Sequence, residues 1–249
     1  MLRISAVSYI NTKPFVYGIE HSGFLKEYSL SLDVPSVCAE KLLKGKVDIG
    51  LAPVAILPKL KEYYILPDFC IGANGPVSSV MLYSDVPLQE IKNVYLDNQS
   101  RTSVMLVQIL AKHFWKIKPR FIGAKKGYET KIKETTAGVI IGDRNFSMKK
   151  RFKHVYDLSE QWNLFTGLPF VFACWISNKK LDKKQSETFY NALKFGLDNR
   201  DKVIKQLQNK YDKKLIKTYL NHSISYYFDS SKRQAMNLFL KLGKDLLLY

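Results

Sequence analysis

The polar segment Ser100-Arg101-Thr102-Ser103 carries residue types that suit the binding of a carboxylate. It contains three hydroxyl groups and a guanidinium, and it leads into an apolar stretch that predicts a buried helix at about 104–115. Hydroxyl groups, a cation and the free N–H groups of a helix N-terminus all donate hydrogen bonds to an anion. A Ser/Thr capping sequence with a surface arginine explains the same residues, so both interpretations stay open.

A second polar segment, Asn11-Thr12-Lys13, follows an apolar strand predicted at Leu2 to Tyr9. Pro14 suits the first position of a helix, and the pattern predicts a helix from Pro14 to Glu20. Asn11 or Thr12 could cap that helix as an ordinary N-cap. Either residue could instead offer polar groups to a ligand, because open α/β sheets bind ligands at the carboxyl ends of their strands.

Three other loops contribute candidate side chains. Ser79 stands at the start of an apolar strand, where a serine is hard to explain by packing alone. Asp143 follows another apolar strand and could accept a substrate hydroxyl or proton, although an aspartate at such a place more often caps the next helix. Thr166 and Gly167 precede the long apolar run Phe170 to Ile176 and could face the same ligand.

Several kinds of site have no support in the sequence. It contains no glycine-rich phosphate loop, no Cys or His pair at metal-ligand spacing and no serine-elbow motif. Its four histidines lie outside the candidate loops. We therefore predict that the protein uses no metal and no cofactor, and that any chemistry relies on carboxylate, hydroxyl, amide and substrate groups.

Composition narrows the class of partner. The 249 residues include 39 Lys and Arg against 22 Asp and Glu, a formal net charge of +17 that would attract anions. The lysines are scattered and no nucleic-acid-binding motif accompanies them, so we expect no nucleic-acid partner. The chain has neither a secretion signal nor an apolar stretch of membrane-spanning length, which predicts a cytoplasmic protein with no membrane partner. Three cysteines without metal spacing are expected to be buried, reduced thiols.

Strand and helix signals alternate along the chain, which predicts the α/β class. The alternation restarts near Ser84, and the apolar run that ends at Ile176 could carry the chain back to the first part. We therefore predict two lobes, residues 1–84 with 176–249 and residues 85–175, with a ligand cleft between them. The chain after residue 176 is predicted to be helical.

Six segments, taken in order, resemble one known family. They are Ser8-Tyr9-Ile10-Asn11-Thr12-Lys13-Pro14, Val47-Asp48-Ile49-Gly50-Leu51-Ala52-Pro53-Val54, Gly75-Pro76-Val77-Ser78-Ser79-Val80, Ser100-Arg101-Thr102-Ser103-Val104, Ile141-Gly142-Asp143 and Thr166-Gly167-Leu168-Pro169-Phe170-Val171-Phe172-Ala173. The chain is similar here to chorismate dehydratase of the futalosine route to menaquinone. The resemblance runs from residue 4 to about 228, and its specificity lies in the order of the segments.

The resemblance implies a two-lobed, type II periplasmic-binding-protein-like fold used as a cytoplasmic lyase, either monomer or homodimer. The implied reaction removes water from chorismate, a small dianion, and gives 3-(1-carboxyvinyloxy)benzoate. Asn11 would lie near the reacting centre, and Asp143 or a carboxylate of the substrate itself would take the proton. The implied substrate-binding residues are Thr12, Ser79, Ser100, Arg101, Thr102, Ser103, Thr166 and Gly167.

Other functions fit the same fold. A non-catalytic solute-binding protein for small anions would need a secretion signal or a lipid anchor, which the sequence lacks. The sister enzyme of the pathway, which makes dihydroxynaphthoate from a cyclised futalosine derivative, carries a different polar motif after its first strand. The effector domain of a regulator would be accompanied by a DNA-binding helix-turn-helix.

Overall fold

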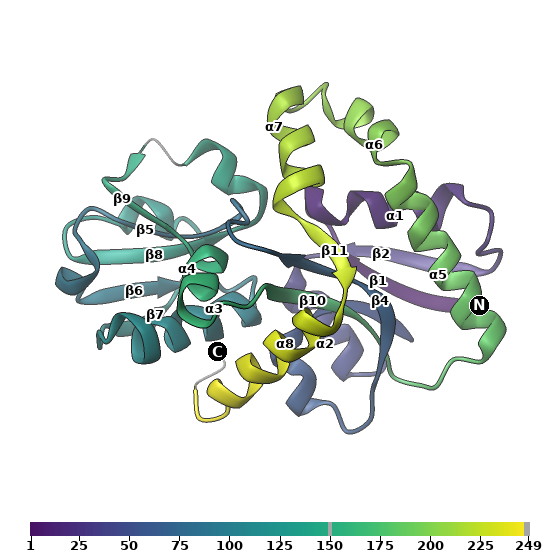
Figure 1. Ribbon diagram of the computed structural model, residues 1–249, viewed down its shortest axis with the longest axis horizontal. Coiled ribbons are helices and arrows are strands. Elements are labelled where there is room, and N and C mark those ends of the chain that lie inside the picture. Colours follow the sequence, from purple (N-terminus) through teal and green to yellow (C-terminus); the bar gives the residue numbers. More distant parts are fainter. Residues whose placement is uncertain (149–150, 247–249) are drawn as a thin grey trace. The chain divides into compact units, whose positions relative to one another are not determined.

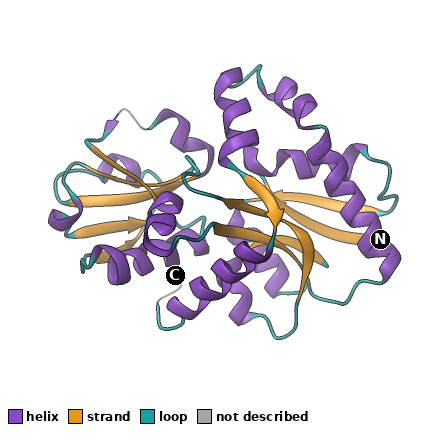
Figure 2. Ribbon diagram, in the orientation of Figure 1, coloured by secondary structure: helices purple, strands orange, loops and turns teal. Residues whose placement is uncertain are grey.

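The computed structural model describes residues 1–148 and 151–246, and the chain divides into two compact units (Figure 1). Unit 1 comprises Met1–Gly72 and Ala173–Asp229, and unit 2 comprises Ala73–Phe172 and Ser230–Tyr249. Each unit contains one β-sheet with helices around it (Figure 2). The α/β class predicted from the alternating pattern is confirmed.

Unit 1 is built on a six-stranded mixed sheet with the order β11-β4-β10-β3-β1-β2. Its strands are β1 (Leu2–Val7), β2 (Tyr28–Asp33), β3 (Ile49–Pro53), β4 (Tyr64–Ala73), β10 (Phe170–Ser177) and β11 (Ser225–Phe228). Strand β1 pairs in parallel with β2 and β3, whereas β10 is antiparallel to β3. The carboxyl ends of β1, β2 and β3 therefore share one edge of the sheet, and the segment that contains Asn11 follows β1 at this edge.

The helices of unit 1 are α1 (Lys13–His21), α2 (Pro35–Leu43), α5 (Lys183–Asp198), α6 (Arg200–Leu207) and α7 (Lys213–Thr218). Helix α1 is held by Phe15, whose ring is fully buried. The Phe15 ring meets the ring of Tyr226 edge to face at 5.3 Å and that of Trp175 at 5.8 Å. Edge-to-face pairs of this kind stabilise a core beyond simple burial, so they fix the start of α1 and with it Asn11.

Helices α1 and α5 approach each other through two glycines. A Cβ atom on Gly18 would collide with the carbonyl oxygen of Ala192, and one on Gly196 would collide with the carbonyl oxygen of Pro14. Both obstacles are backbone atoms, so they cannot move aside as the end of a side chain could. The two helices can lie this close only because neither position carries a side chain.

We expect Gly196→Ala to lower the free energy of unfolding by about 3 kcal/mol, because the added methyl group must push the two helices apart. Urea denaturation followed by circular dichroism measures the change. Gly123→Ala is the matched control: no heavy atom lies within 4 Å of its Cβ position, and we expect a change within about 0.5 kcal/mol. Equal stability of the two variants would contradict the close packing.

Asp48 joins the beginning of β3 to two cations of unit 1. Its carboxylate accepts hydrogen bonds from the backbone N–H of Arg3 at 2.9 Å and from the Arg3 side chain at 3.2 Å, and Lys179 Nζ lies 3.2 Å away. These interactions, the Arg3 side-chain hydrogen bond first among them, hold the pKa of Asp48 well below its usual range. The carboxylate therefore stabilises the fold only while it is charged.

From this shift we expect a loss of stability in acid. The stabilisation by Asp48 is complete above the unfolded-state pKa of about 3.9 and is lost as the pH falls below that value towards the lower folded-state pKa. Urea midpoints at pH 7, 5 and 3.5 should therefore fall more steeply for the parent protein than for Asp48→Asn, which has no carboxylate to protonate. Parallel pH dependences for the two proteins would show that Asp48 contributes nothing to acid sensitivity.

Unit 2 is built on a five-stranded mixed sheet with the order β7-β6-β8-β5-β9. Its strands are β5 (Val80–Ser84), β6 (Asn93–Leu96), β7 (Arg120–Gly123), β8 (Thr136–Ile141) and β9 (His154–Asp157), and its helices are α3 (Arg101–Ile109), α4 (Leu158–Thr166) and α8 (Ser230–Leu242). Strand β6 is parallel to β7 and β8, and β5 is antiparallel to β8 and β9. The carboxyl ends of β6, β8 and β9 therefore meet the start of β5 at one edge.

The structure differs from the predicted lobes at their boundaries. The chain passes between the units after residues 72 and 172, earlier than the predicted positions near 84 and 176, and it passes a third time after residue 229. This third passage places α8 in unit 2, where Phe239 packs against the rings of Trp162 and Phe170 at 6.2 and 5.2 Å. The apolar face of α8 is visible in the sequence, but its partner is not.

Several elements were not predicted. They are β4, β9, α4 and β11. The prediction that the chain after residue 176 is helical is wrong at β11, a four-residue strand that pairs antiparallel with β4. Strands this short hold few repeats of the apolar alternation, so their pairing partners decide their conformation.

Candidate functional site

Most of the predicted site residues lie at one edge of the sheet of unit 2, where β6, β8 and β9 end and β5 begins. The backbone N–H of Gly142, just after β8, donates to the carbonyl oxygen of Ser79 at the start of β5, at 2.8 Å. Asp97 follows β6 directly, and its carboxylate accepts from the backbone N–H of Ile141 at 3.4 Å. The structure thereby brings together Ser79, the segment 100–103 and the loop that begins at Gly142 and contains Asp143.

The hydroxyl groups at the start of α3 are used for structure. Ser100 is the N-cap: its Oγ accepts from the backbone N–H of Ser103 at 3.1 Å and donates to Ser103 Oγ at 2.9 Å. Thr102 Oγ1 donates to the carbonyl oxygen of Phe172 at 3.0 Å. All three hydroxyl residues are less than 8% exposed. The capping interpretation is therefore confirmed for Ser100, while ligand binding by the three hydroxyls stays a prediction.

Arg101 is used differently from its neighbours. It occupies the first position of α3, yet across the described part of the chain its side chain makes no hydrogen bond or ion pair. Its Nε is buried without a partner. A buried N–H group that loses water and gains no partner costs about 1–3 kcal/mol. No hydrogen bond from Arg101 therefore braces its own loop, and within the described residues no carboxylate competes with an anion for this half-buried side chain.

Backbone strain and a buried carboxylate shape the loop that leads to Ser79. Ser78 has a φ of +65°, a left-handed conformation that is uncommon for a residue other than glycine. Its backbone N–H donates to Asp157 Oδ2 at 2.6 Å, and Asp157 Oδ1 caps α4 through the N–H of Ser159 at 3.0 Å. Burial raises the pKa of Asp157. Strained residues that the surroundings hold in place are concentrated at functional sites.

Asn145 joins the two loops that carry Ser79 and Asp143. The Asn145 side chain is fully buried, and its Nδ2 donates at 3.0 Å to the carbonyl oxygens of both Ser79 and Gly142. Its Oδ1 accepts from the hydroxyl of Tyr83 at 2.9 Å. Asp143 itself is half-buried in the first turn of the 3₁₀ helix Gly142–Ser147. Sequence reasoning missed Asn145, because nothing near it in the chain shows what it joins.

Thr166 and Gly167 are not part of this group. Helix α4 starts next to Ser78 and continues for nine residues, about 13 Å, before it reaches Thr166. Thr166 Oγ1 donates to the carbonyl oxygen of Trp162, and Gly167 ends the helix with a φ of +71°. The structure thus gives both residues a role in helix termination, and their predicted contact with substrate has no support from the geometry of unit 2.

In unit 1, Asn11 and Thr12 lie where β1 leads into α1. A 3₁₀ turn, Ile10–Thr12, precedes the helix, and the predicted helix is confirmed as Lys13–His21. Thr12 stands at the N-cap position, but its side chain does not cap the helix; its Oγ1 donates to Asn11 Oδ1 at 3.1 Å. The carbonyl oxygen of Asn11 accepts from the hydroxyl of Tyr226 at 2.9 Å.

The bond from Tyr226 holds the backbone of Asn11, and the bond from Thr12 orients its half-buried side chain. Its oxygen is occupied by Thr12, whereas its Nδ2 makes no hydrogen bond within residues 1–148 and 151–246. The amide therefore presents two N–H donors at the carboxyl edge of the sheet of unit 1.

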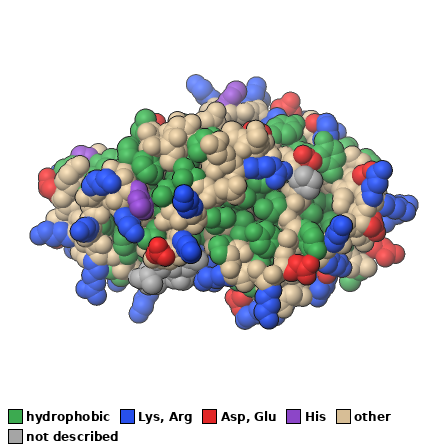
Figure 3. All heavy atoms as spheres, turned by 60° about the horizontal axis from the view of Figure 1, so that its bottom comes forward, with side chains coloured by type: hydrophobic (Ala, Val, Ile, Leu, Met, Phe, Trp, Pro, Cys, Tyr) green, Lys and Arg blue, Asp and Glu red, His purple; other side chains and the backbone are tan. Residues whose placement is uncertain are grey.

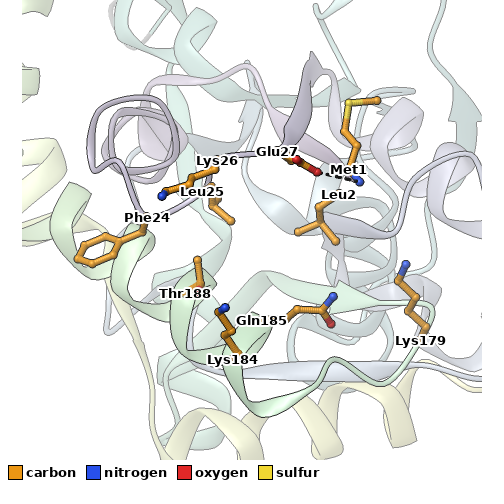
Figure 4. Close-up of a pocket in the computed structure, with 10 residues that line it drawn as sticks. All are labelled: Met1, Leu2, Phe24, Leu25, Lys26, Glu27, Lys179, Lys184, Gln185 and Thr188. Carbon is orange, nitrogen blue, oxygen red and sulfur yellow. Dashed lines mark ion pairs between the residues drawn. The ribbon is translucent and has the colours of Figure 1, made fainter.

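A pocket of about 600 Å³ lies elsewhere in unit 1 (Figure 4). Met1 and Leu2 line it at the beginning of β1, so it lies at the end of that strand opposite to Asn11. The cations around it are partly paired: the N-terminal amine lies 3.9 Å from Glu27, and Lys179 pairs with Asp48. The pocket does not coincide with any predicted site residue.

The remaining observations concern surface charge, metal ligands and hydropathy. On the face drawn in Figure 3, Lys and Arg side chains are dispersed among hydrophobic and acidic ones rather than gathered in a stripe. Among the residues that the structure describes, no group of three His, Cys, Asp or Glu side chains is arranged to hold a metal ion. No helix of the described chain has the length and hydropathy to cross a bilayer.

Comparison with known proteins gives a family. A family model described as "Menaquinone biosynthesis" matches residues 2–245. A curated chorismate dehydratase from Thermus thermophilus is 30% identical over 185 residues, which cover 67% of this chain and 66% of that enzyme, a little under two thirds of its length.

Solved structures show the fold. Protein AF1704 from Archaeoglobus fulgidus superposes with a TM-score of 0.73 at 13% identity, over 98% of this chain and 96% of its own. The Candida albicans CA3427 gene product, described as having the generic periplasmic binding protein fold, superposes with a TM-score of 0.63 at 12% identity, over 99% and 90% of the two chains. The fold class predicted from the resemblance, that of the periplasmic binding proteins, is therefore confirmed.

Proposed function

This chain belongs to the menaquinone biosynthesis family, and from that premise we propose that it is a lyase that removes water from chorismate. The product is 3-(1-carboxyvinyloxy)benzoate. The ring hydroxyl leaves with its C–O bond electrons, the hydrogen on the neighbouring ring carbon leaves as a proton, and the ring becomes aromatic. The reaction is therefore strongly downhill, and the protein has only to lower its barrier and to hold the substrate. We place the enzyme in the cytoplasm, as a monomer or a homodimer.

The observation that carries this proposal is the unpaired guanidinium of Arg101. Chorismate has two carboxylates, and a guanidinium forms its strongest hydrogen bonds with a carboxylate. Within the described residues the half-buried Arg101 side chain has no partner that a substrate carboxylate would have to displace. Helix α3 starts at the same residue, and the partial positive charge of its N-terminus favours the same anion. Ser79 and the Thr12 hydroxyl stay candidates for further contacts with the substrate.

Asn11 acts at the reacting centre in this proposal. Its Nδ2 donors are free, and the bond from Thr12 fixes the orientation of the amide. An N–H donor aimed at the leaving hydroxyl stabilises the negative charge that develops as the C–O bond breaks. The same donor could instead orient the carboxylate of the enolpyruvyl arm, which must be kept away from the conformation that rearranges to prephenate.

Two groups could take the ring proton: the carboxylate of Asp143, or the enolpyruvyl carboxylate of chorismate itself. We expect Asp143→Asn to separate them. If Asp143 is the base, turnover falls by about 100-fold or more, because general-base catalysis contributes about 10²–10⁴ to the rate. Turnover within about twofold of the parent, measured at saturating chorismate, would assign the proton to the substrate carboxylate.

The function itself is tested by incubating the purified protein with chorismate and separating the products by chromatography with mass spectrometry. An aromatic product lighter than chorismate by one water is the expected result. Unchanged chorismate that raises the melting temperature would instead identify a small-anion binding protein. Absence of both turnover and stabilisation would contradict chorismate as the ligand.

A further inference from the structure

We propose that Asp97 is a positioning residue, one whose buried carboxylate holds the substrate-binding edge of unit 2 in its working arrangement. The inference rests on the proposed function. Asp97 does not touch the reacting atoms in this proposal. It acts through the loop that carries Arg101 and through the loop that carries Asp143.

The surroundings of Asp97 support this role. Its side chain is 1% exposed, although charged side chains are rarely buried so completely. The Oδ2 atom accepts from three separate elements: the hydroxyl of Tyr128 at 3.0 Å, the backbone N–H of Ile141 at 3.4 Å, and the guanidinium of Arg144. The Oδ1 atom accepts from the backbone N–H of Gln99 at 3.0 Å. Both oxygens therefore accept hydrogen bonds, Oδ2 from three donors and Oδ1 from one.

These partners connect the two loops that bear the proposed binding and reacting groups. The bond to Gln99 fixes the turn immediately before Ser100, the N-cap of the helix that begins with Arg101. The bonds to Ile141 and Arg144 fix the segment on either side of Asp143. One carboxylate thus sets the spacing between the Arg101 helix start and the Asp143 loop.

A second carboxylate keeps Arg144 in place. Glu129 Oε1 lies 2.5 Å from Arg144 Nη1, so the guanidinium bridges a buried acid and a partly exposed one. Arg144 is itself partly exposed, so only the Asp97 side of the pair is fully buried. Ion pairs that bury a charge contribute little net stability compared with well-packed apolar groups, and their best-attested use is to specify one arrangement. This reasoning favours positioning over stabilisation as the reason for a buried charge at this edge.

The test compares Asp97→Asn with Asp48→Asn in steady-state kinetics with chorismate. In Asp97→Asn the amide oxygen could still accept from the Gln99 N–H. The amide NH₂ group, itself a donor, would then face the Tyr128 hydroxyl, the Ile141 N–H and the Arg144 guanidinium, which are donors too. We expect kcat/KM to fall by about 20-fold, mainly through a higher KM, because displacement of a binding group by a fraction of an ångström weakens its contacts. Asp48 also pairs with an arginine, but it lies in unit 1 away from Asn11, and Asp48→Asn should leave both constants within about twofold.

The rise in KM identifies positioning, because it reports displacement of the Arg101 helix start, whereas displacement of the Asp143 loop would also lower kcat. A purely structural role would reduce the active fraction, which lowers the apparent kcat and leaves KM unchanged; that result, or unaltered kinetics, would overturn the inference. If Asp97→Asn does not fold, Tyr128→Phe removes one donor from the same carboxylate, and an unchanged KM there would overturn it as well. An inactive parent protein would instead refute the proposed function, and this inference with it.

Discussion

Replacement of Asn11 by alanine is expected to reduce the turnover of chorismate by at least about 100-fold. Loss of one donor that stabilises developing negative charge typically costs about 10²–10³ in kcat. The Nδ2 of Asn11 carries two free N–H donors, while Thr12 holds the side-chain oxygen and Tyr226 holds the backbone carbonyl oxygen. Product formation at saturating chorismate measures the effect, and circular dichroism shows whether the variant is folded.

Asn93→Ala is the matched control for Asn11→Ala. Asn93 is also half-buried, but it stands at the beginning of β6, at the end of the strand opposite to Asp97. Its side chain makes a single 3.4 Å bond to Thr136 Oγ1, so its loss should change turnover by less than about twofold. A folded Asn11→Ala protein with the turnover of Asn93→Ala would refute the proposed role of Asn11.

Replacement of Arg101 by methionine is expected to raise the KM for chorismate by about 30-fold. Hydrogen bonds to charged groups contribute about 1.5–3 kcal/mol, and 1.4 kcal/mol corresponds to a factor of ten. Methionine keeps the length and the helix propensity of the side chain but removes its donors. Because the Nε of Arg101 is buried and unpartnered in the free protein, the variant should also be at least as stable as the parent. Initial rates and thermal denaturation measure the two effects.

Arg120→Met is the control for Arg101→Met. It distinguishes a direct contact between Arg101 and the substrate from the attraction that the net charge of +17 exerts on any anion. Arg120 is exposed on β7 of the same unit, so the change in net charge is identical while the candidate site is untouched. Salt screens exposed charges beyond about 8–10 Å, and we expect the KM to stay within about twofold of the parent. Equal KM values for the two variants would mean that Arg101 contributes only to the overall charge.

Several features of the fold and of the candidate site can be predicted from local sequence. The Asn11-Thr12-Lys13 segment was predicted to end a strand and begin a helix, and the structure has β1 ending at Val7 and α1 beginning at Lys13. Ser100 was predicted as a possible cap and caps α3. These features depend on residues within a few positions of one another, so composition and spacing suffice to predict them.

The residues that hold the candidate site together were not predicted. Asp97, Asn145 and Asp157 are ordinary polar residues in their own segments, and each acquires its role from partners more than forty positions away. A lone aspartate after a strand has the same local signature whether it is solvated or fully buried. Whether such an aspartate is buried is decided by which strands pair beside it.

The sequence by itself determined the α/β class, the polar loops after the strands and, through the order of six segments, the family. Periodicity, turn residues and caps are local, and each is encoded by neighbours in the chain. The tertiary structure alone decided which loops share an edge and that α8 belongs to unit 2. It also decided that Arg101 Nε is unpaired while the neighbouring Ser100 and Ser103 hydroxyls are hydrogen-bonded to each other. Likewise, it placed Thr166 at the far end of α4 from the loop that leads to Ser79. These features depend on contacts between segments far apart in the chain. The free energy of such contacts cannot be inferred from the residues of one segment.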